Sequence, residues 1–287
     1  MKPPPFEYAR PGSLDEVLGL LAEHGDDAKV LAGGQSLVPL LSMRLARPAL
    51  LVDINHVLSL DNVSRVGGST RVGALVRQAA FAGCSALGDR CLPYVGHFVT
   101  RNRGTVAGSI AHADASAELP VALVASGGSV VASSKSGTRE IAAEDFFVTH
   151  FTTALDPTEL LVETCWPDGG AADGYGYGFA EFALRAGDYA LAMAACVMRV
   201  RAGAAAETRI AVGSVVDRPT LLAEAAAIIN GRPVARDVAR EAGSAASAAV
   251  YPPDALHASG EYLRNLTGVM VERAVLDAWH DATGAAA

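Results

Sequence analysis

Two short glycine-rich segments constrain the fold of this chain more than any other feature. Ala32-Gly-Gly-Gln-Ser36 follows a predicted strand at 29–32 and precedes an apolar, helix-like run at 37–45, and Gly104-Thr-Val-Ala-Gly-Ser109 has the same small, glycine-rich design. Glycine permits positive φ and a close approach of the backbone, so consecutive amides in such a loop can converge on an anion. Each segment alone also fits an ordinary turn.

The charge of the chain bears on which ligand such loops would hold. Lysine and arginine number 23 against 31 aspartates and glutamates, which gives a net charge of −8. The sequence has no run of basic residues, and this argues against a nucleic-acid partner. Main-chain amides would then be the natural counter-groups of a phosphate. The glycine-lysine signature of a P-loop and the G-x-G-x-x-G signature of a Rossmann fold are both absent.

The pattern of apolar residues divides the chain into three parts. Residues 1–57 predict a small α/β unit, whose helix at 14–25 begins with the capping box Ser13-Leu-Asp-Glu16. Residues 58–177 alternate short strands and helical patches. The strands are expected at 70–72, 130–132 and 159–166, and the helices at 76–81 and 119–125. The glycine-rich stretch 168–178 is the best candidate for a linker.

The last part, residues 178–287, has a different order. Three strands are expected first, at 179–184, 191–200 and 209–216, and helices follow at 220–230, 234–248 and 259–282. Strands followed by a run of helices predict an α+β fold, with a sheet covered by helices.

Other polar clusters indicate a functional site less strongly than the two glycine-rich segments do. His112, Asp114 and Glu118 could form a metal site, but they equally fit a loop that caps a helix at 118–125, and the carboxylates could accept hydrogen bonds from sugar hydroxyls. The four cysteines are irregularly spaced, so this chain is not expected to hold an iron–sulfur cluster. Neither an apolar leader nor a run of about 18 apolar residues is visible, so we expect a cytoplasmic protein without a transmembrane segment.

These motifs together resemble a known family, the flavoprotein (medium) subunits of the molybdenum hydroxylases, which include carbon monoxide and xanthine dehydrogenases. The resemblance covers nearly the whole chain. It is densest in Leu31–Leu37, in Arg101–Asp114, in Glu118-Leu-Pro120 and in Arg185-Ala-Gly-Asp-Tyr-Ala190, with further similarity in Phe6-x-Tyr8-x-Arg-Pro11 and His257-x-Ser259-x-x-Tyr262.

The resemblance implies a fold and a cofactor site. The FAD-binding region would span residues 1–177 in two subdomains, about 1–57 and 58–177, and a C-terminal three-stranded sheet with helices would span 178–287. The two glycine loops would hold the pyrophosphate of FAD, Asp114 and Glu118 would lie near its hydroxyls, and Arg185 and Tyr189 would lie near the flavin ring. The implied cofactor-binding residues are Lys29, Leu31, Ala32, Gly33, Gly34, Gln35, Ser36, Leu37, Thr105, Ala107, Gly108, Ser109, Asp114, Glu118, Arg185 and Tyr189.

The sequence departs from the family pattern in the second loop. The family commonly has Thr-Ile/Val-Gly-Gly where this chain has Thr105-Val-Ala107-Gly108. If the backbone at Ala107 needs a positive φ, alanine would be strained there by about 1 kcal/mol or more, and FAD would bind less tightly. Ala115 stands where the family often has proline, and the loss of the proline would loosen the loop.

The implied function is electron transfer without a catalytic side chain on this chain. A large partner subunit with a molybdenum cofactor would oxidise the substrate, and a small partner with 2Fe-2S clusters would pass the electrons to the FAD, which would deliver them to an external acceptor. The absence of cluster cysteines in this chain agrees with such a division of labour. A dimer of such heterotrimers is expected. Two alternatives are a stand-alone FAD-dependent oxidoreductase and an assembly module that has lost FAD.

Overall fold

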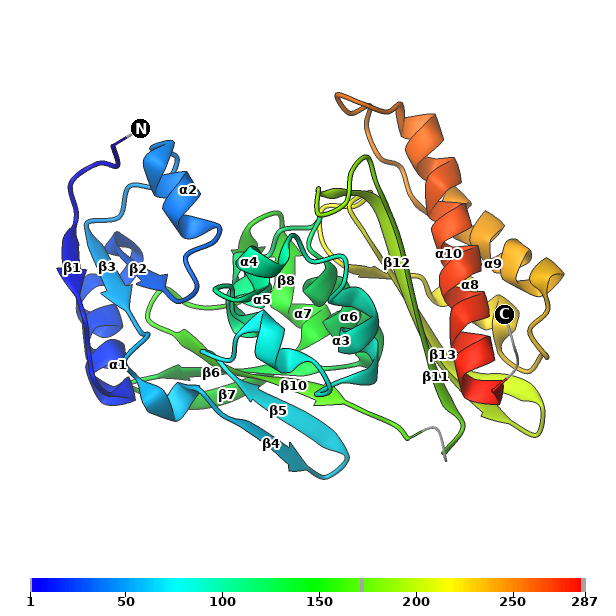
Figure 1. Cartoon of the computed structure of the whole chain (residues 1–287), viewed down its shortest axis with the longest axis horizontal. Coiled ribbons are helices and arrows are strands. Elements are labelled where there is room, and N and C mark those ends of the chain that lie inside the picture. Colours follow the sequence, from blue (N-terminus) through cyan, green and yellow to red (C-terminus); the bar gives the residue numbers. More distant parts are fainter. Residues whose placement is uncertain (1, 171–172, 285–287) are drawn as a thin grey trace.

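The computed structural model describes residues 2–170 and 173–284. Three layers of secondary structure follow one another along the longest axis, in the order of the sequence (Figure 1). A small N-terminal sheet lies at one end, a five-stranded sheet with short helices lies in the middle, and a sheet backed by helices lies at the other end. This is the α+β arrangement predicted from the sequence.

The N-terminal unit contains three short parallel strands and two helices. Strands β1 (Glu7–Ala9), β3 (Leu50–Asp53) and β2 (Ala28–Leu31) pair in that order. Helix α1 (Leu14–His24) starts as the capping box predicts, because Ser13 Oγ accepts a hydrogen bond from the Glu16 amide. Its apolar face buries Val17, Leu18 and Leu21, and helix α2 (Leu37–Ser42) follows β2 after the first glycine loop.

The middle unit is built on an antiparallel sheet with the strand order β4-β5-β10-β6-β7. Its strands are β4 (Val63–Val66), β5 (Ser69–Gly73), β6 (Ser129–Ser134), β7 (Gly137–Ala142) and β10 (Leu160–Pro167), beside a small pair β8 (Phe147–Thr149) and β9 (Thr152–Thr153). Its helices are α3 (Ala86–Cys91), α4 (Phe98–Arg101), α5 (Val106–His112), α6 (Glu118–Ser126) and α7 (Ala143–Phe146), and its short 3-10 turns lie at Leu58–Leu60 and Gln78–Phe81. A further 3-10 turn, Gly25–Asp27, lies between α1 and β2 of the N-terminal unit.

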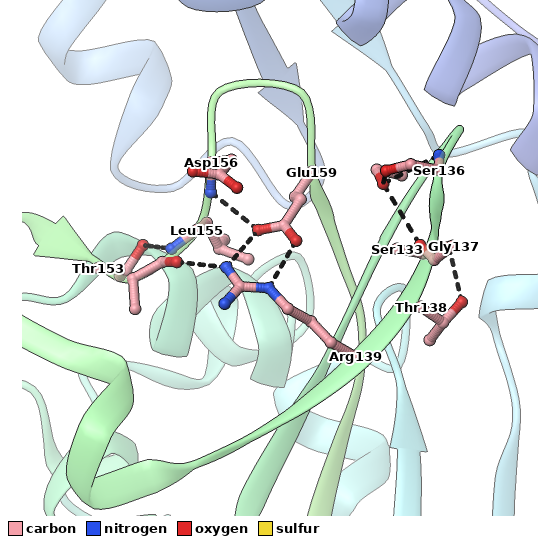
Figure 2. Close-up of polar contacts among 11 residues, drawn as sticks. Ser133, Ser136, Gly137, Thr138, Arg139, Thr153, Leu155, Asp156 and Glu159 are labelled. Carbon is pink, nitrogen blue, oxygen red and sulfur yellow. Dashed lines mark hydrogen bonds and ion pairs between the residues drawn. The ribbon is translucent and has the colours of Figure 1, made fainter.

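An ion pair fixes the edge of this sheet. Arg139 on β7 donates to both carboxylate oxygens of Glu159, at 2.7 and 2.8 Å, and to the carbonyl of Ala154 (Figure 2). Glu159 also accepts from the Asp156 amide at 2.8 Å. Hydrogen bonding to Arg139 lowers the pKa of Glu159, so the carboxylate stays charged and holds the turn that leads into β10.

The C-terminal unit is a sheet that buries both of its faces. Strands β11 (Tyr175–Ala183), β12 (Ala190–Arg201), β13 (Ala204–Gly213) and β14 (Thr220–Leu221) pair in sequence order. Alternate residues of β12 enter different cores, since Met193 and Ala195 pack toward the middle unit whereas Ala194 and Cys196 pack toward the helices. The covering helices are α8 (Ala223–Ile229), α9 (Arg236–Ala249) and α10 (Gly260–Thr283).

Two details differ from the sequence-based expectation. The sheet has a fourth, two-residue strand, β14, beside the three predicted strands. The predicted linker at 168–178 is partly wrong, because its last residues, from Tyr175 to Gly178, already belong to β11. Gly176 and Gly178 lie in this strand, and both positions need glycine because α10 packs directly against them. A β-carbon on Gly178 would lie 2.8 Å from the Ala278 amide nitrogen. Across the described ranges, no helix is both long and apolar enough to cross a membrane.

Candidate functional site

The first glycine loop presents a row of unpaired amides. Five successive amide groups, from Gly33 to Leu37, donate no hydrogen bond to any described residue, and these residues are half-buried or exposed. The next amide, of Val38, bonds to the Gly34 carbonyl at 3.0 Å and starts α2. Gly34 has a φ of +71°, which a side chain would strain. Unpaired adjacent amides of this kind form a binding site for an anion.

The second glycine loop is a helix N-terminus and differs from the first. Thr105 is the N-cap of α5, and its hydroxyl oxygen accepts from the Gly108 amide at 3.0 Å. The Val106 amide bonds to the carbonyl of Val76, and the Ser109 amide bonds to that of Thr105. Only the amides of Thr105 and Ala107 lack an acceptor among the described residues of this turn. The expectation that both loops share one design is therefore wrong.

The backbone at Ala107 carries none of the strain that the sequence suggested. Ala107 lies in α5, and it is not among the residues with positive φ. Its side chain is 3% exposed and belongs to the main hydrophobic core. Alanine is a strong helix former, so it suits this position better than the glycine common in the family.

This placement makes a prediction for Ala107→Gly. The substitution removes a buried methyl group and adds backbone freedom to a helix, so we expect it to lower the free energy of unfolding by about 1 kcal/mol and to leave FAD affinity unimproved. Urea denaturation and FAD titration of the two proteins measure both effects. Tighter FAD binding by the glycine variant would contradict this account of the loop.

The fold brings the two loops into contact. A β-carbon on Gly33 would lie 2.7 Å from Gly104 Cα and still closer to the carbonyl oxygen of Arg103. The first loop comes from the N-terminal unit and the second from the middle unit, so the two units meet at this contact. The unpaired amides of Gly33–Leu37 and the start of α5 lie on the two segments that meet there, and together they are here called the amide cradle.

Carboxyl groups lie beyond the second loop. Asp114 follows α5 and accepts from the Ser116 amide at 2.9 Å, while Glu118 begins α6 and is 8% exposed. Burial, reinforced by the nearby Asp114 carboxylate, raises the pKa of Glu118 to about 7. Burial and then Glu118 raise the pKa of Glu181, on β11, to about 8. Oε2 of Glu181 is buried and has no hydrogen-bond partner among the described residues.

These two carboxyl groups predict a pH-dependent stability. Their folded pKa values lie above the ordinary value of about 4.3, so the folded state holds protons that the unfolded state releases. Stability is therefore complete below the unfolded pKa and falls as the pH rises through the folded values of about 7 and about 8. We expect Glu181→Gln to melt above the wild type by a margin that grows from about pH 5 to about pH 9.

Thermal melts across this pH range measure the margin. Glu23→Gln, at an exposed position on α1, serves as the matched control and should show a constant difference. A constant difference for Glu181→Gln as well would contradict the assignment of a half-buried Glu181 that is protonated in the folded state.

The aromatic candidate lies at an exposed turn between β11 and β12. Tyr189 is 68% exposed. Desolvation of the part of its side chain that is covered, followed by the negative charges of Asp114 and Glu118, raises its pKa. Gly187 in the same turn lies against the imidazole of His97. Arg185 is largely exposed and pairs with Asp188 at 3.2 Å, and within the described ranges no hydrogen bond or ion pair joins its side chain to the cradle.

The remaining candidates flank the first loop or the carboxylates. Lys29 and Leu31 belong to β2, which leads into the loop. Burial lowers the pKa of His112; the Asp114 carboxylate opposes this shift, and the charge of Lys29 adds to it. The His112 ring packs on Phe151 at 4.9 Å between centroids. No group of three or more metal-ligating side chains occurs in the part of the chain that the structure describes.

Sequence reasoning missed two residues that join the loops from behind, Asn55 and Arg77. Asn55 donates to the Ala32 carbonyl at 2.9 Å, and Arg77 donates to the Arg103 carbonyl at 2.6 Å and to Asn55 at 2.7 Å. Neither belongs to a glycine motif. The only signal was that Asn55 follows the end of a predicted strand.

The amide cradle offers main-chain donors for an anionic ligand in a chain that has no Rossmann fingerprint. Comparison with known proteins defines the class of the chain. Residues 4–168 match the family described as the FAD binding domain in molybdopterin dehydrogenase, and residues 177–278 match the CO dehydrogenase flavoprotein C-terminal domain.

Individual relatives match over almost the entire chain. The 6-hydroxypseudooxynicotine dehydrogenase complex subunit alpha of Paenarthrobacter nicotinovorans is 39% identical, with 98% of this chain and 97% of the relative covered. The structure of quinoline 2-oxidoreductase from Pseudomonas putida 86 superposes with a TM-score of 0.93 at 36% identity, over 98% of this chain and 99% of that one. Carbon monoxide dehydrogenase from Hydrogenophaga pseudoflava gives a TM-score of 0.91 at 32% identity, over 98% and 99% of the two chains.

The chain therefore belongs to the family of FAD-binding medium subunits of molybdenum hydroxylases, the family of the carbon monoxide dehydrogenase medium chain. Its cofactor is FAD, and it is the flavoprotein subunit of an oxidoreductase complex. The resemblance found in the sequence is thereby confirmed.

Proposed function

We propose that this chain holds the pyrophosphate of one FAD on the amide cradle. The observation that carries the proposal is the row of five unpaired amides from Gly33 to Leu37, which supplies donors without requiring cationic side chains. The hydroxyls of Ser36 and Ser109 and the amides of Thr105 and Ala107 lie at the same two loops. In a chain with a net charge of −8, main-chain dipoles are a physically suitable partner for phosphate.

The remaining site residues are proposed to position the rest of the cofactor. Asp114 and Glu118 would accept hydrogen bonds from its hydroxyl groups, Lys29 and Leu31 would flank the first loop, and Tyr189 would shield the flavin ring from solvent. Arg185 would approach the ring only after leaving its ion pair with Asp188, which is an exposed and weak one. When bound, FAD accepts electrons one at a time and delivers a pair.

We further propose that the chain works as a relay between two partner subunits and an external acceptor. A large subunit would carry the molybdenum cofactor, and a small subunit would carry 2Fe-2S clusters, in a dimer of heterotrimers. The division of labour is supported by the cysteines, because Cys91, Cys165 and Cys196 are buried and Cys84 is half-buried, and all four are free thiols. The cytoplasmic location and the domain boundaries stay predictions.

Purification of the tagged full-length chain from its own host tests the relay. The expected product is a complex of three kinds of chain that contains molybdenum, iron and FAD, in which the reducing substrate bleaches the flavin. The isolated chain should bleach only with a chemical reductant. A chain that elutes alone and turns over a substrate would support the alternative, a stand-alone FAD-dependent oxidoreductase.

A further inference from the structure

A chain of three hydrogen bonds links the backs of the two glycine loops. It runs from the Ala32 carbonyl to Asn55 Nδ2 at 2.9 Å, from Asn55 Oδ1 to Arg77 Nη2 at 2.7 Å, and from Arg77 Nη1 to the Arg103 carbonyl at 2.6 Å. Asn55 follows β3 in the N-terminal unit, whereas Arg77 follows β5 in the middle unit. The pair, here called the loop clasp, therefore joins the same two units that meet at the contact between the loops.

The orientation of Asn55 is fixed by its own neighbours. Asp53 Oδ1 accepts from the Asn55 backbone amide at 2.9 Å and from Asn55 Nδ2 at 2.6 Å, and Tyr8 donates its hydroxyl to Asp53 Oδ2. Burial opposes the charge on Asp53, but the hydrogen bonds from Tyr8 and Asn55 outweigh it and lower its pKa. The Asn55 amide nitrogen is thus directed at carbonyl and carboxylate oxygens, and its oxygen is left for Arg77.

The hydrogen bond from Asn55 bears on the direction of the first loop amide, that of Gly33. In a trans peptide the carbonyl and the following N–H point in opposite directions. Because Asn55 holds the Ala32 carbonyl behind the loop, the Gly33 N–H must point away from Asn55. Arg77 holds the Arg103 carbonyl, against which Gly33 packs, so the same clasp also sets the spacing between the two loops.

We infer that Asn55 and Arg77 are positioning residues for the cofactor, which act through the two loops. This inference rests on the proposed role of the amide cradle in holding the FAD pyrophosphate. The clasp sets the direction of the Gly33 amide, the first of the loop, and the distance from that loop to the segment that leads into α5. FAD affinity should therefore depend on both residues jointly, since removal of either one breaks the same chain of bonds.

A double-mutant cycle on FAD affinity tests the clasp. Asn55→Ala, Arg77→Met and the double variant are prepared as full chains, freed of flavin and titrated with FAD. Each single variant should bind FAD about 10- to 100-fold more weakly, as expected for charge-assisted hydrogen bonds, and the double variant should be no weaker than the weaker single. The visible circular dichroism of bound flavin should change in both singles.

Three comparisons make the outcome decisive. Arg65→Met is the matched control, because Arg65 donates to one backbone carbonyl, that of Gly83, in the same unit, and it should retain normal affinity. Arg77→Lys keeps the charge but cannot reach both acceptors, so it should bind weakly; normal affinity in this variant would overturn the clasp. Far-ultraviolet circular dichroism of the flavin-free proteins identifies any unfolded variant, and Arg77→Lys then supplies the test.

Different results would contradict the proposed clasp and the proposed role of the cradle. A wild-type chain that binds no FAD contradicts the proposed function itself. A wild-type chain that binds FAD, together with clasp variants that bind equally well or lose affinity additively, overturns only the clasp and leaves Asn55 and Arg77 as ordinary links between the two units.

Discussion

Gly33→Ala is expected to abolish FAD binding by the isolated chain. The added methyl group would lie 2.7 Å from Gly104 Cα and closer still to the Arg103 carbonyl oxygen, and neither backbone atom can rotate out of the way. The two loops must then separate, which breaks the common surface on which the pyrophosphate would rest. A loss of affinity of at least about 100-fold should appear in a titration of the flavin-free protein with FAD.

The matched control is Gly19→Ala on α1. A β-carbon there would be 3.7 Å from Lys135 Cε, which is an ordinary contact, and alanine favours a helix by about 1 kcal/mol over glycine. This variant should bind FAD normally and unfold at slightly higher urea. Normal FAD affinity in Gly33→Ala would mean that the contact between the loops is not needed for the cofactor.

Gly178→Ala is expected to have the largest effect on stability. The new β-carbon would collide with the backbone of α10, at the Ala274 carbonyl and 2.8 Å from the Ala278 nitrogen. Helix α10 would have to move off the sheet that it covers, so we expect the free energy of unfolding to fall by about 3 kcal/mol. Urea denaturation followed by circular dichroism measures the loss.

The consequence should extend beyond the C-terminal unit. Phe179 and Met193, on the same sheet, belong to the hydrophobic core shared with the middle unit, so loosening the sheet also loosens the support of α6. Gly19→Ala again provides the comparison for a glycine with free space. A stability of Gly178→Ala equal to that of the wild type would contradict the close packing of α10 on β11.

The local parts of this structure were predictable from the sequence. The capping box at Ser13 defined the start of α1, and the apolar pattern located β2 and the three long strands of the C-terminal sheet. Gly176 and Gly178 were read as linker residues, because a missing side chain signals either a flexible turn or a close approach of another backbone. Only the position of α10 distinguishes these two uses.

The site was predictable as a set of motifs but not as a geometry. Gly33 and Thr105 were named from sequence, and the structure brings the Gly33 loop against Gly104, the residue before Thr105. The helical backbone of Ala107 was not predictable, since a family preference for glycine suggests positive φ without establishing it. Asn55 and Arg77 carry no motif, and their roles come from the tertiary arrangement of two strand ends.

The central claim is that this chain binds one FAD on its amide cradle. The most direct test is the visible absorption spectrum of the purified full-length chain, with identification and quantification of the flavin that heat releases. The account predicts a yellow protein with FAD in a ratio of about one per chain, either as purified or after soaking with FAD and desalting. A colourless chain after soaking would contradict the account. Strain at Ala107 could not explain such a loss of FAD, because the backbone of Ala107 is helical and has no positive φ.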